Sequence, residues 1–365
     1  MKVLHVITRM NQGGTARWLE KLSDGLISAG WDSVLIAGEV GGNEVEDSSF
    51  KELHGIKVHS LGKGKGPISD LRAFFQLRAI FKSQNPDVVN THTSKAGVIG
   101  RLAAASIFTA RPRIIHTYHG HLLYGYFSKP VTRTITIIEK CMSALTNRFI
   151  VAGKTVRDEL ILSGVGSIDQ YSVVKPGIDS RDKLDPEVAR KQFGISKDSL
   201  VVGWMGRFEN IKSPLRVVEL AINFPSIIFL MAGGGSRFDE INSKAPANLL
   251  LPGWCDPNEI WSASDIALLT SENEALPIAL IEAGLAGIPA VAENVGAVSE
   301  VVGHKKSGFL CNTFEERVNA LALLIEDSQL RNQMGENARK FCLSEFSEQK
   351  FTQNHIQAYL GVLSK

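Results

Sequence analysis

Residues 265–294 read DIALLTSENEALPIALIEAGLAGIPAVAEN, and this stretch decides the fold of the second half of the chain. An apolar run, DIALLT, and a second one, PAVAEN, flank PIALIEAGLAG, in which apolar residues recur with a helical period. Two buried strands joined by a helix are typical of a parallel sheet that is covered on both faces. The stretch therefore predicts one strand–helix–strand unit of a doubly wound domain.

The same alternation of strand and helix runs through most of the 365 residues. It stops between residues 171 and 199, where Pro, Gly and charged residues cluster, and it resumes at LVVGWMG. We therefore expect an α/β protein with two doubly wound, Rossmann-like domains that face a central cleft. The predicted domains span residues 1–175 and 176–344, and a closing helix in residues 345–365 is expected to cross back to the first domain.

Composition narrows the class of protein. The four cysteines lie far apart without a C-x-x-C pair, which argues against a disulfide framework or a zinc site and favours the cytoplasm. No run approaches about 18 apolar residues, so no membrane-spanning helix is predicted. Residues 1–181 carry 23 Lys and Arg against 15 Asp and Glu, or +8, and the remainder carries −6. We expect the first half to face an anionic partner other than a nucleic acid, with a merely solvated basic surface as the alternative.

Two acids mark the loop and the helix that follow DIALLT. Pro277 suits the first helical position, so Glu274 falls just before the helix and Glu282 inside it, about 12 Å away along the axis. The N–H groups of the first helical turn favour a phosphate, and the acids could bind hydroxyls on either side of it. This outline matches a nucleotide sugar. Alternatively, Glu274 is only a helix-start acid and Glu282 a solvated one.

Cations and glycines occupy the loops after two other predicted strands. In GRFENIKS, at 206–213, Arg207 and Lys212 could neutralise a departing diphosphate, although two surface cations would have the same pattern. In MNQGGT, at 10–15, Gly13 and Gly14 would let a ligand approach the backbone closely, or they form a simple tight turn. The absence of G-x-G-x-x-G gives a dinucleotide site little support.

Three histidines end the predicted strand in IIHTYHGH. His116, His119 and His121 suggest a metal, but no carboxylate or cysteine accompanies them at ligand spacing, so we expect no metal. A hydrogen bond from one imidazole to a sugar hydroxyl is the more plausible role. The chain also contains no D-x-D, the usual carboxylate pair of a metal-held diphosphate.

These motifs together resemble the retaining, two-domain glycosyltransferases of family 4, which have the GT-B architecture. The resemblance covers most of the chain and is most specific in ENEALPIALIEAGLAGIPAVAENVGAVSEVV, where seven residues separate the acids Glu274 and Glu282. THTSKAGVIGRLAA and HGHLLYGYF look most like members that build bacterial surface polysaccharide on a polyprenyl-diphosphate carrier. Ala275 and Ser213 depart from the family, which commonly has Gly at both positions, and this leaves the identity of the donor sugar open.

The resemblance implies a role for each candidate residue. The diphosphate would be bound by Arg207 and Lys212, with Gly14 near it and Gly13 beside that glycine. Glu282 would hold the nucleotide ribose. Glu274 would contact the donor sugar, and the backbone of Ala275, Leu276 and Pro277 would grip sugar and phosphate. The reacting sugar would lie near His119, with His121 as the less favoured candidate.

The implied reaction moves a sugar from a nucleoside diphosphate, UDP by family frequency, to a hydroxyl of a saccharide or a polyprenyl-diphosphate-linked acceptor. It retains the anomeric configuration and needs neither metal nor cofactor. A nucleotide-sugar 2-epimerase of the same fold is the alternative enzyme, and a sugar-binding protein is a third reading. The segment 63–82 mixes cations with an apolar face, so it is predicted either to rest on an anionic membrane or to cover the sheet as an ordinary amphipathic helix.

Overall fold

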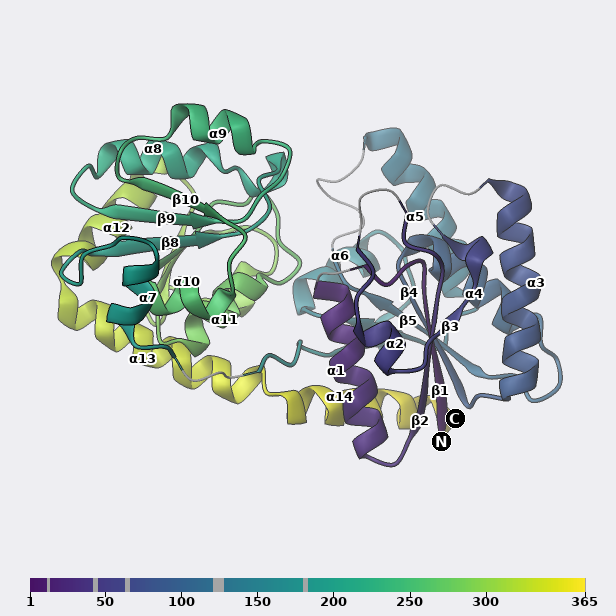
Figure 1. Ribbon diagram of the computed structural model, residues 1–365. Helices are drawn as coiled ribbons and strands as arrows, with labels where there is room; N and C mark the ends of the chain where they lie inside the picture. Colours follow the sequence, from purple (N-terminus) through teal and green to yellow (C-terminus); the bar gives the residue numbers. More distant parts are fainter. Residues whose placement is uncertain (12–13, 42–44, 63–65, 121–127, 180–182, 365) are drawn as a thin grey trace. The chain divides into compact units, whose positions relative to one another are not determined.

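The computed structural model describes residues 1–365 except 12–13, 42–44, 63–65, 121–127, 180–182 and 365. The chain forms two compact units, each built around its own parallel sheet (Figure 1). Unit 1 contains residues 1–177 and 348–365, and unit 2 contains residues 178–347. The last helix therefore belongs to the unit that begins the chain. The doubly wound α/β fold that the strand and helix rhythm predicts is confirmed.

Unit 1 has a sheet of seven strands in the order β3-β2-β1-β4-β5-β6-β7. Its strands are β1 Lys2–Ile7, β2 Asp32–Ala37, β3 Ile56–Lys57, β4 Val88–His92, β5 Arg113–Tyr118, β6 Arg148–Val151 and β7 Tyr171–Val173. Its helices are α1 Gly14–Ser28, α2 Ser49–Glu52, α3 Pro67–Gln84, α4 Ser94–Ala105, α5 Lys129–Ser143, α6 Lys154–Leu162 and α14 Glu348–Leu363, with short 3-10 turns at η1 His59–Leu61 and η2 Ile168–Gln170.

Helices cover both faces of this sheet. One face packs on α3 and α4, where Leu4 and Val6 of β1 meet Leu77 and Ile99. The other face packs on α1, through residues such as Leu19, and α1 in turn contacts α14. The alternating side chains of each strand are therefore divided between two separate buried layers.

Unit 2 has a sheet of six strands in the order β10-β9-β8-β11-β12-β13. Its strands are β8 Val201–Met205, β9 Ile228–Ala232, β10 Leu249–Gly253, β11 Ile266–Leu269, β12 Ala290–Glu293 and β13 Gly308–Cys311. Its helices are α7 Pro186–Gln192, α8 Leu215–Asn223, α9 Phe238–Lys244, α10 Pro257–Ala263, α11 Ile278–Leu285, α12 Phe314–Glu326 and α13 Ser328–Glu345, with 3-10 turns at η3 Asn210–Lys212 and η4 Val298–Glu300.

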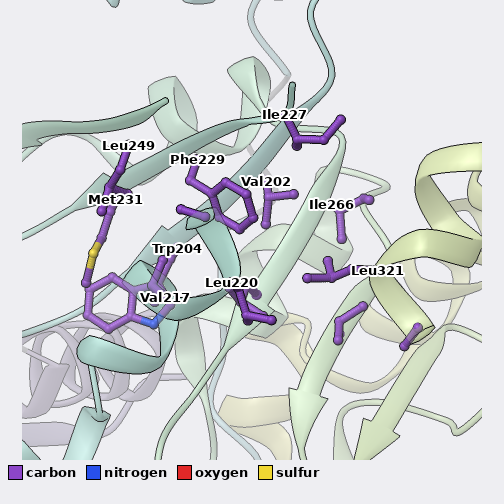
Figure 2. Packing of buried hydrophobic residues seen from close by; sticks show 14 of the residues in the cluster. Val202, Trp204, Val217, Leu220, Ile227, Phe229, Met231, Leu249, Ile266 and Leu321 are labelled. Atoms are coloured by element: carbon purple, nitrogen blue, oxygen red, sulfur yellow. The ribbon is translucent and has the colours of Figure 1, made fainter. Parts of the chain in front are cut away.

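The core of unit 2 is an apolar layer between the sheet and helices α8, α9 and α12. Figure 2 shows part of this layer, with Trp204 and Phe229 from the strands and Leu321 from α12. Both aromatic rings are almost completely buried. Burial of large side chains contributes roughly 1.5–3 kcal/mol each, so this layer fixes the sheet and the positions of the loops at its edge.

The segment from 171 to 199, predicted as a linker, is partly regular. Residues Tyr171–Val173 form β7 at the edge of the first sheet, and Pro186–Gln192 form α7 in unit 2. A three-residue strand gives too short an apolar run to stand out beside the Pro and Gly that follow. Asp185 caps α7 by accepting hydrogen bonds from the N–H groups of Glu187 and Val188. The edge strand β3 is shorter still, because only Ile56–Lys57 pairs with β2 before the 3-10 turn η1.

Within the described residues, none of the helices combines the length and the apolar character that crossing a membrane requires. The helix predicted within residues 63–82 is α3, of which Ala73, Leu77 and Phe81 are buried against the core. Residues 63–65 lie outside the described part of the chain.

Candidate active site

The order of strands in unit 2 reverses between β8 and β11. These two strands are neighbours in the sheet, but the chain leaves β8 toward β9 on one side and returns to β11 on the other. Ligands of open parallel sheets bind beyond the carboxyl ends of the strands at such a switch point. The loops that follow β8 and β11 hold Arg207, Lys212 and Glu274, so the topology brings these predicted residues to one edge of the sheet.

Lys212 and Glu274 form an ion pair across this switch point. The ammonium Nζ of Lys212 donates to Oε1 of Glu274, and the hydroxyl of Ser271 donates to the same oxygen over 2.6 Å. Glu274 is only 8% exposed. A buried carboxylate needs such partners because it has lost most of its hydration. Two residues that are 62 positions apart in the sequence are thereby held at hydrogen-bonding distance.

Hydrogen bonds to backbone carbonyls join the two loops that carry this pair. The hydroxyl of Thr270 donates to the carbonyl of Lys212 over 2.9 Å, and the N–H of Glu272 donates to the carbonyl of Ile211 over 2.8 Å. Ser213, the residue after Lys212, has φ +46° and ψ +53° in the left-handed region. This conformation favours glycine, which explains physically why a glycine would suit the position.

Gly296, in the loop after β12, packs directly on the backbone of Glu274. A Cβ atom at Gly296 would collide with the carbonyl oxygen of Glu274, and the glycine has φ +50°. The N–H of Ala297 donates to this carbonyl over 2.9 Å. A third loop therefore fixes the backbone that carries the carboxylate, and only glycine fits at the point of contact.

Arg207 and the acid Glu282 are both more exposed than Glu274. Arg207 is exposed in the loop after β8, two residues from Glu209. Hydrogen bonds from Ser236 hold the pKa of Glu209 below its ordinary value, with a smaller contribution from Arg207. Glu282 is the fifth residue of α11 and is partly exposed. The roles of Arg207 and Glu282 in binding a ligand remain predictions.

The helix start differs from the prediction by one residue. Pro277 is the N-cap of α11, with ψ +95°, and the first helical residue is Ile278. The carbonyl of Pro277 accepts the first helical hydrogen bonds, from the N–H groups of Leu280 and Ile281. The side chains of Leu276 and Pro277 are buried and that of Ala275 is partly so. If this segment contacts a ligand, it does so chiefly through its backbone.

A buried cluster of charges below the site has no counterpart in the sequence analysis. Glu293, at the end of β12, accepts hydrogen bonds from Arg317 over 2.5 Å and from Arg216 over 3.2 Å. Arg216 also donates to the carbonyl of Thr270 over 3.1 Å, beside the Lys212 loop. Burial raises the pKa of Glu293, and the two guanidinium groups oppose that rise. A charged residue closing the apolar run AVAE is the signal that could have identified it.

In unit 1 the structure places only some of the predicted residues. Gly14 is the first residue of α1 and is exposed, with open space where a side chain would start. Gly13 and His121 lie outside the described residues. His116 packs beneath α4, where its Nδ1 lies 2.8 Å from the hydroxyl of Thr91. It is therefore not brought together with His119, which lies on the opposite face of the sheet near α1.

His119 instead contacts His92, which was not among the predicted site residues. The Nε2 atom of His119 lies 2.8 Å from Nδ1 of His92, and the other ring nitrogen of His92 lies 3.2 Å from Nδ1 of His5. His5 was missed because it is a single polar residue within an otherwise apolar run, and His92 because it follows Asn90 and Thr91 at the polar end of its strand. The useful signal is the alternation of side chains along VVNTH, which places Asn90 and His92 on one face.

Two family models match consecutive parts of the chain. The one described as Glycosyltransferase Family 4 matches residues 12–182, and the one described as Glycosyl transferases group 1 matches residues 185–341. Among curated relatives, the Escherichia coli UDP-Gal:alpha-D-GlcNAc-diphosphoundecaprenol alpha-1,3-galactosyltransferase is 27% identical over 95% of this chain and 93% of its own. The Staphylococcus aureus capsular polysaccharide biosynthesis glycosyltransferase CapM is 25% identical over 77% of this chain and 78% of its own.

Solved structures share the fold over the full length. Sucrose-phosphate synthase from Thermosynechococcus elongatus superimposes with a TM-score of 0.85 at 18% identity, and the alignment covers 100% of both chains. Anabaena HepE in complex with UDP and glucose gives a TM-score of 0.82 at 19% identity, covering 99% of this chain and 100% of the other. The two Rossmann-like units thus form the GT-B fold. With matched models over both units, the chain belongs to family 4 of the glycosyltransferases.

Proposed function

We propose that this glycosyltransferase moves a sugar from a UDP-linked donor to a hydroxyl of a saccharide or polyprenyl-diphosphate-linked acceptor, with retention of the anomeric configuration and without a metal. The observation that carries the proposal is the ion pair of Lys212 and Glu274 at the switch point of unit 2. An ammonium group there suits a diphosphate, and a fixed carboxylate suits sugar hydroxyls.

In the proposed reaction, the charge that develops on the departing diphosphate would lie beside this ion pair. The bond between the anomeric carbon and the diphosphate oxygen breaks, and a bond from the acceptor oxygen to the same face of that carbon forms. The departing diphosphate takes the acceptor proton, so no separate base is needed. Lys212, assisted by Arg207, would stabilise the charge that develops on the diphosphate. Glu282 would bind the ribose, and Gly14 would lie near the diphosphate.

The relatives support the donor and acceptor classes. The name of the Escherichia coli relative gives a UDP-linked galactose as donor and a diphosphoundecaprenol-linked sugar as acceptor. The 2-epimerase alternative is not favoured by these matches, which are transferases and a synthase. An epimerase would also convert the donor when no acceptor is present, whereas a transferase would at most hydrolyse it slowly.

The first experiment is a thermal-shift panel with UDP-, GDP- and ADP-sugars. A ligand at 100 times its dissociation constant adds about 2.7 kcal/mol to the free energy of unfolding, so the preferred donor raises the melting temperature most. The selected donor is then incubated with a synthetic polyprenyl-diphosphate-linked saccharide, with and without EDTA. We expect EDTA-insensitive transfer and a product with the donor's anomeric configuration by proton NMR. Inversion, or conversion of the donor alone, would contradict the proposal.

A matched pair of variants tests the site itself. Glu274→Gln removes the buried charge, and Glu272→Gln removes a charge two residues earlier in the same loop, where the side chain is exposed. We expect Glu274→Gln to lose most of the transfer rate and Glu272→Gln to keep it. Equal rates in the two variants would exclude a role for Glu274 in the reaction.

We also propose that α3 rests on an anionic membrane surface. Besides its buried face, α3 exposes Ile68, Leu71 and Phe75, with exposed fractions of 73%, 59% and 58%, and Arg72 lies beside them. Apolar residues next to a cation suit the boundary between lipid headgroups and acyl chains. The wild type should sediment with anionic vesicles at low salt and a Leu71→Ser, Phe75→Ser variant should not. If the wild type ignores such vesicles, the membrane proposal fails.

A further inference from the structure

Three histidines of unit 1 form a continuous hydrogen-bonded chain from the core to the end of β5. His5 in β1 meets His92 at the end of β4 over 3.2 Å, and His92 meets His119 over 2.8 Å. Consecutive ring centroids are 5.5 Å and 5.0 Å apart. His5 and His92 are completely buried, whereas His119 is partly exposed. The chain therefore leads from a closed interior to a ring that a ligand can reach.

Aromatic and neutral groups surround this chain. Trp18 of α1 packs edge-on against His119 at 5.3 Å and against His355 of α14 at 5.7 Å. Burial lowers the pKa of His5 and of His119 to about 3 and that of His92 well below its ordinary value, with neighbouring histidines adding to the shift. All three rings are therefore neutral at physiological pH.

The single proton on each neutral ring limits the hydrogen bonds that the three rings can form. A neutral imidazole has one N–H donor and one acceptor nitrogen. Both nitrogens of His92 are used, so it must donate to one neighbour and accept from the other. The proton positions on the three rings are then linked. Either all three rings carry their proton on Nδ1, or all three carry it on Nε2. Because Nε2 of His119 faces His92, Nδ1 is the atom of His119 left for other contacts.

We propose that His92 and His5 are positioning residues, which hold His119 so that its Nδ1 atom meets a hydroxyl of the reacting sugar. The identity of that ligand rests on the function proposed above, whereas the hydrogen-bonded chain does not. The group that orients a functional histidine is commonly a carboxylate or a backbone carbonyl. A carboxylate would stabilise the imidazolium, but a neutral imidazole does not. His119 therefore acts as a neutral hydrogen-bonding partner of the sugar and not as an acid or base.

NMR tests the chain without any ligand or activity. In the full-length protein labelled with ¹⁵N-histidine, long-range ¹H–¹⁵N spectra report the proton position on each ring. We expect His5, His92 and His119 to share one tautomer and to stay neutral from pH 8 to pH 5. If His119 titrates in this range, or if its ring is a mixture of tautomers unrelated to that of His92, the chain is disproved.

Two variants of His92 separate positioning from mere packing. In His92→Asn the amide lies near the position of Nδ1, so it can still contact His119 but not His5. In His92→Leu both contacts are lost. We expect kcat/KM to fall about 10- to 100-fold in His92→Leu, as for outer partners of metal-binding histidines, and to stay within a few fold of wild type in His92→Asn. The tautomer of His119 should change only in His92→Leu.

Controls keep the outcomes distinct. Hydrogen exchange of β1 and β4, the strands of unit 1 that carry His5 and His92, shows whether His92→Leu remains folded, and a milder His5→Val variant replaces it if it does not. His5→Val should keep the hydrogen bond between His92 and His119, and with it the tautomer that these two rings share, but it removes the constraint that His5 places on that tautomer. A normal tautomer pattern with unchanged kcat/KM in these variants would overturn the positioning role. Failure of every donor in the wild type would instead refute the proposed function.

Discussion

The switch points of the two units share a topology and differ in chemistry. In unit 2 the loops after β8 and β11 meet through an ion pair, Lys212 with Glu274. In unit 1 the loops after β1 and β4 meet through neutral groups, because the hydroxyls of Thr8 and Thr93 lie 2.7 Å apart. The same doubly wound frame thus joins its two loops through a charged pair in unit 2 and through two uncharged hydroxyls in unit 1. The side chains of the loops, and not the topology, decide which ligand group each edge suits.

Histidines reinforce this contrast. Eight of the nine histidines belong to unit 1, and the ninth, His304, is exposed in unit 2. In unit 1 burial lowers the pKa of five of them: His5, His92, His116, His119 and His355. The uncharged state of these five buried rings therefore depends on pH, whereas the ion pair of unit 2 contains no histidine.

Acidification should produce the largest difference between the two units, because it should destabilise unit 1 more than unit 2. A histidine whose pKa is lower when folded binds more protons when unfolded, so the stability it gives is complete above pH 6.5 and declines as pH falls toward about 3. Between pH 7 and pH 5.5 each such histidine costs about 1 kcal/mol, and five together cost about 5 kcal/mol. Hydrogen exchange, corrected for the intrinsic rate, should show β1 and β4 losing protection while β8 and β11 keep theirs. Equal losses in both sheets would contradict this.

Removing the charge of unit 2 should have the next largest effect. Lys212→Met should lower kcat by about 10²- to 10³-fold, the loss found when a fixed group that stabilises developing charge is removed. It also leaves Glu274 buried without its ammonium partner, so the melting temperature should fall. The double variant with Glu274→Gln should regain stability but not activity.

Lys191 on α7 supplies the control for this prediction, because it is an exposed lysine of the same unit. Lys191→Met should keep both rate and melting temperature. If Lys212→Met keeps full activity as well, the charge contrast between the switch points has no functional meaning.

A smaller effect is expected at Gly296. The substitution Gly296→Ala forces a Cβ against the carbonyl of Glu274 and places alanine at φ +50°. We expect a loss of about 1–3 kcal/mol in stability, measured by urea unfolding, and a weaker response to the donor. Gly194→Ala is the control, since Gly194 has φ +68° but open space around its Cβ position. If the two variants lose equal stability, the contact of Gly296 with the Glu274 backbone is unimportant.

Long, strongly patterned elements could be predicted from the sequence. The strands β1, β8 and β11 are buried and largely apolar, β4 is buried and begins with two valines, and both α/β units follow from the alternation of such strands with helices. By contrast, β7 lies within the segment 171–199, where no strand is predicted. A three-residue edge strand is too short to produce a recognisable apolar pattern in the sequence.

Residues of the candidate site could be predicted where their chemistry and their spacing in the sequence both indicated the same function. Lys212 and Glu274 were identified as functional candidates, but their contact depends on strand order, which local patterns do not contain. The buried cluster around Glu293 and the contact of His92 with His119 were missed for the same reason. Each joins residues from neighbouring strands or helices that are distant in the sequence.

The position of α14 in the chain affects how unit 1 folds during synthesis. On α14, Phe351 packs against Trp18 at 4.9 Å, and Tyr359 accepts a hydrogen bond from Asn90 over 2.8 Å. These partners are synthesised before unit 2, and α14 is synthesised after it. Unit 1, which leaves the ribosome first, therefore cannot bury this face until α14 has been made. A premature stop immediately before α14 would destabilise unit 1, at the beginning of the chain, more than unit 2 next to the stop.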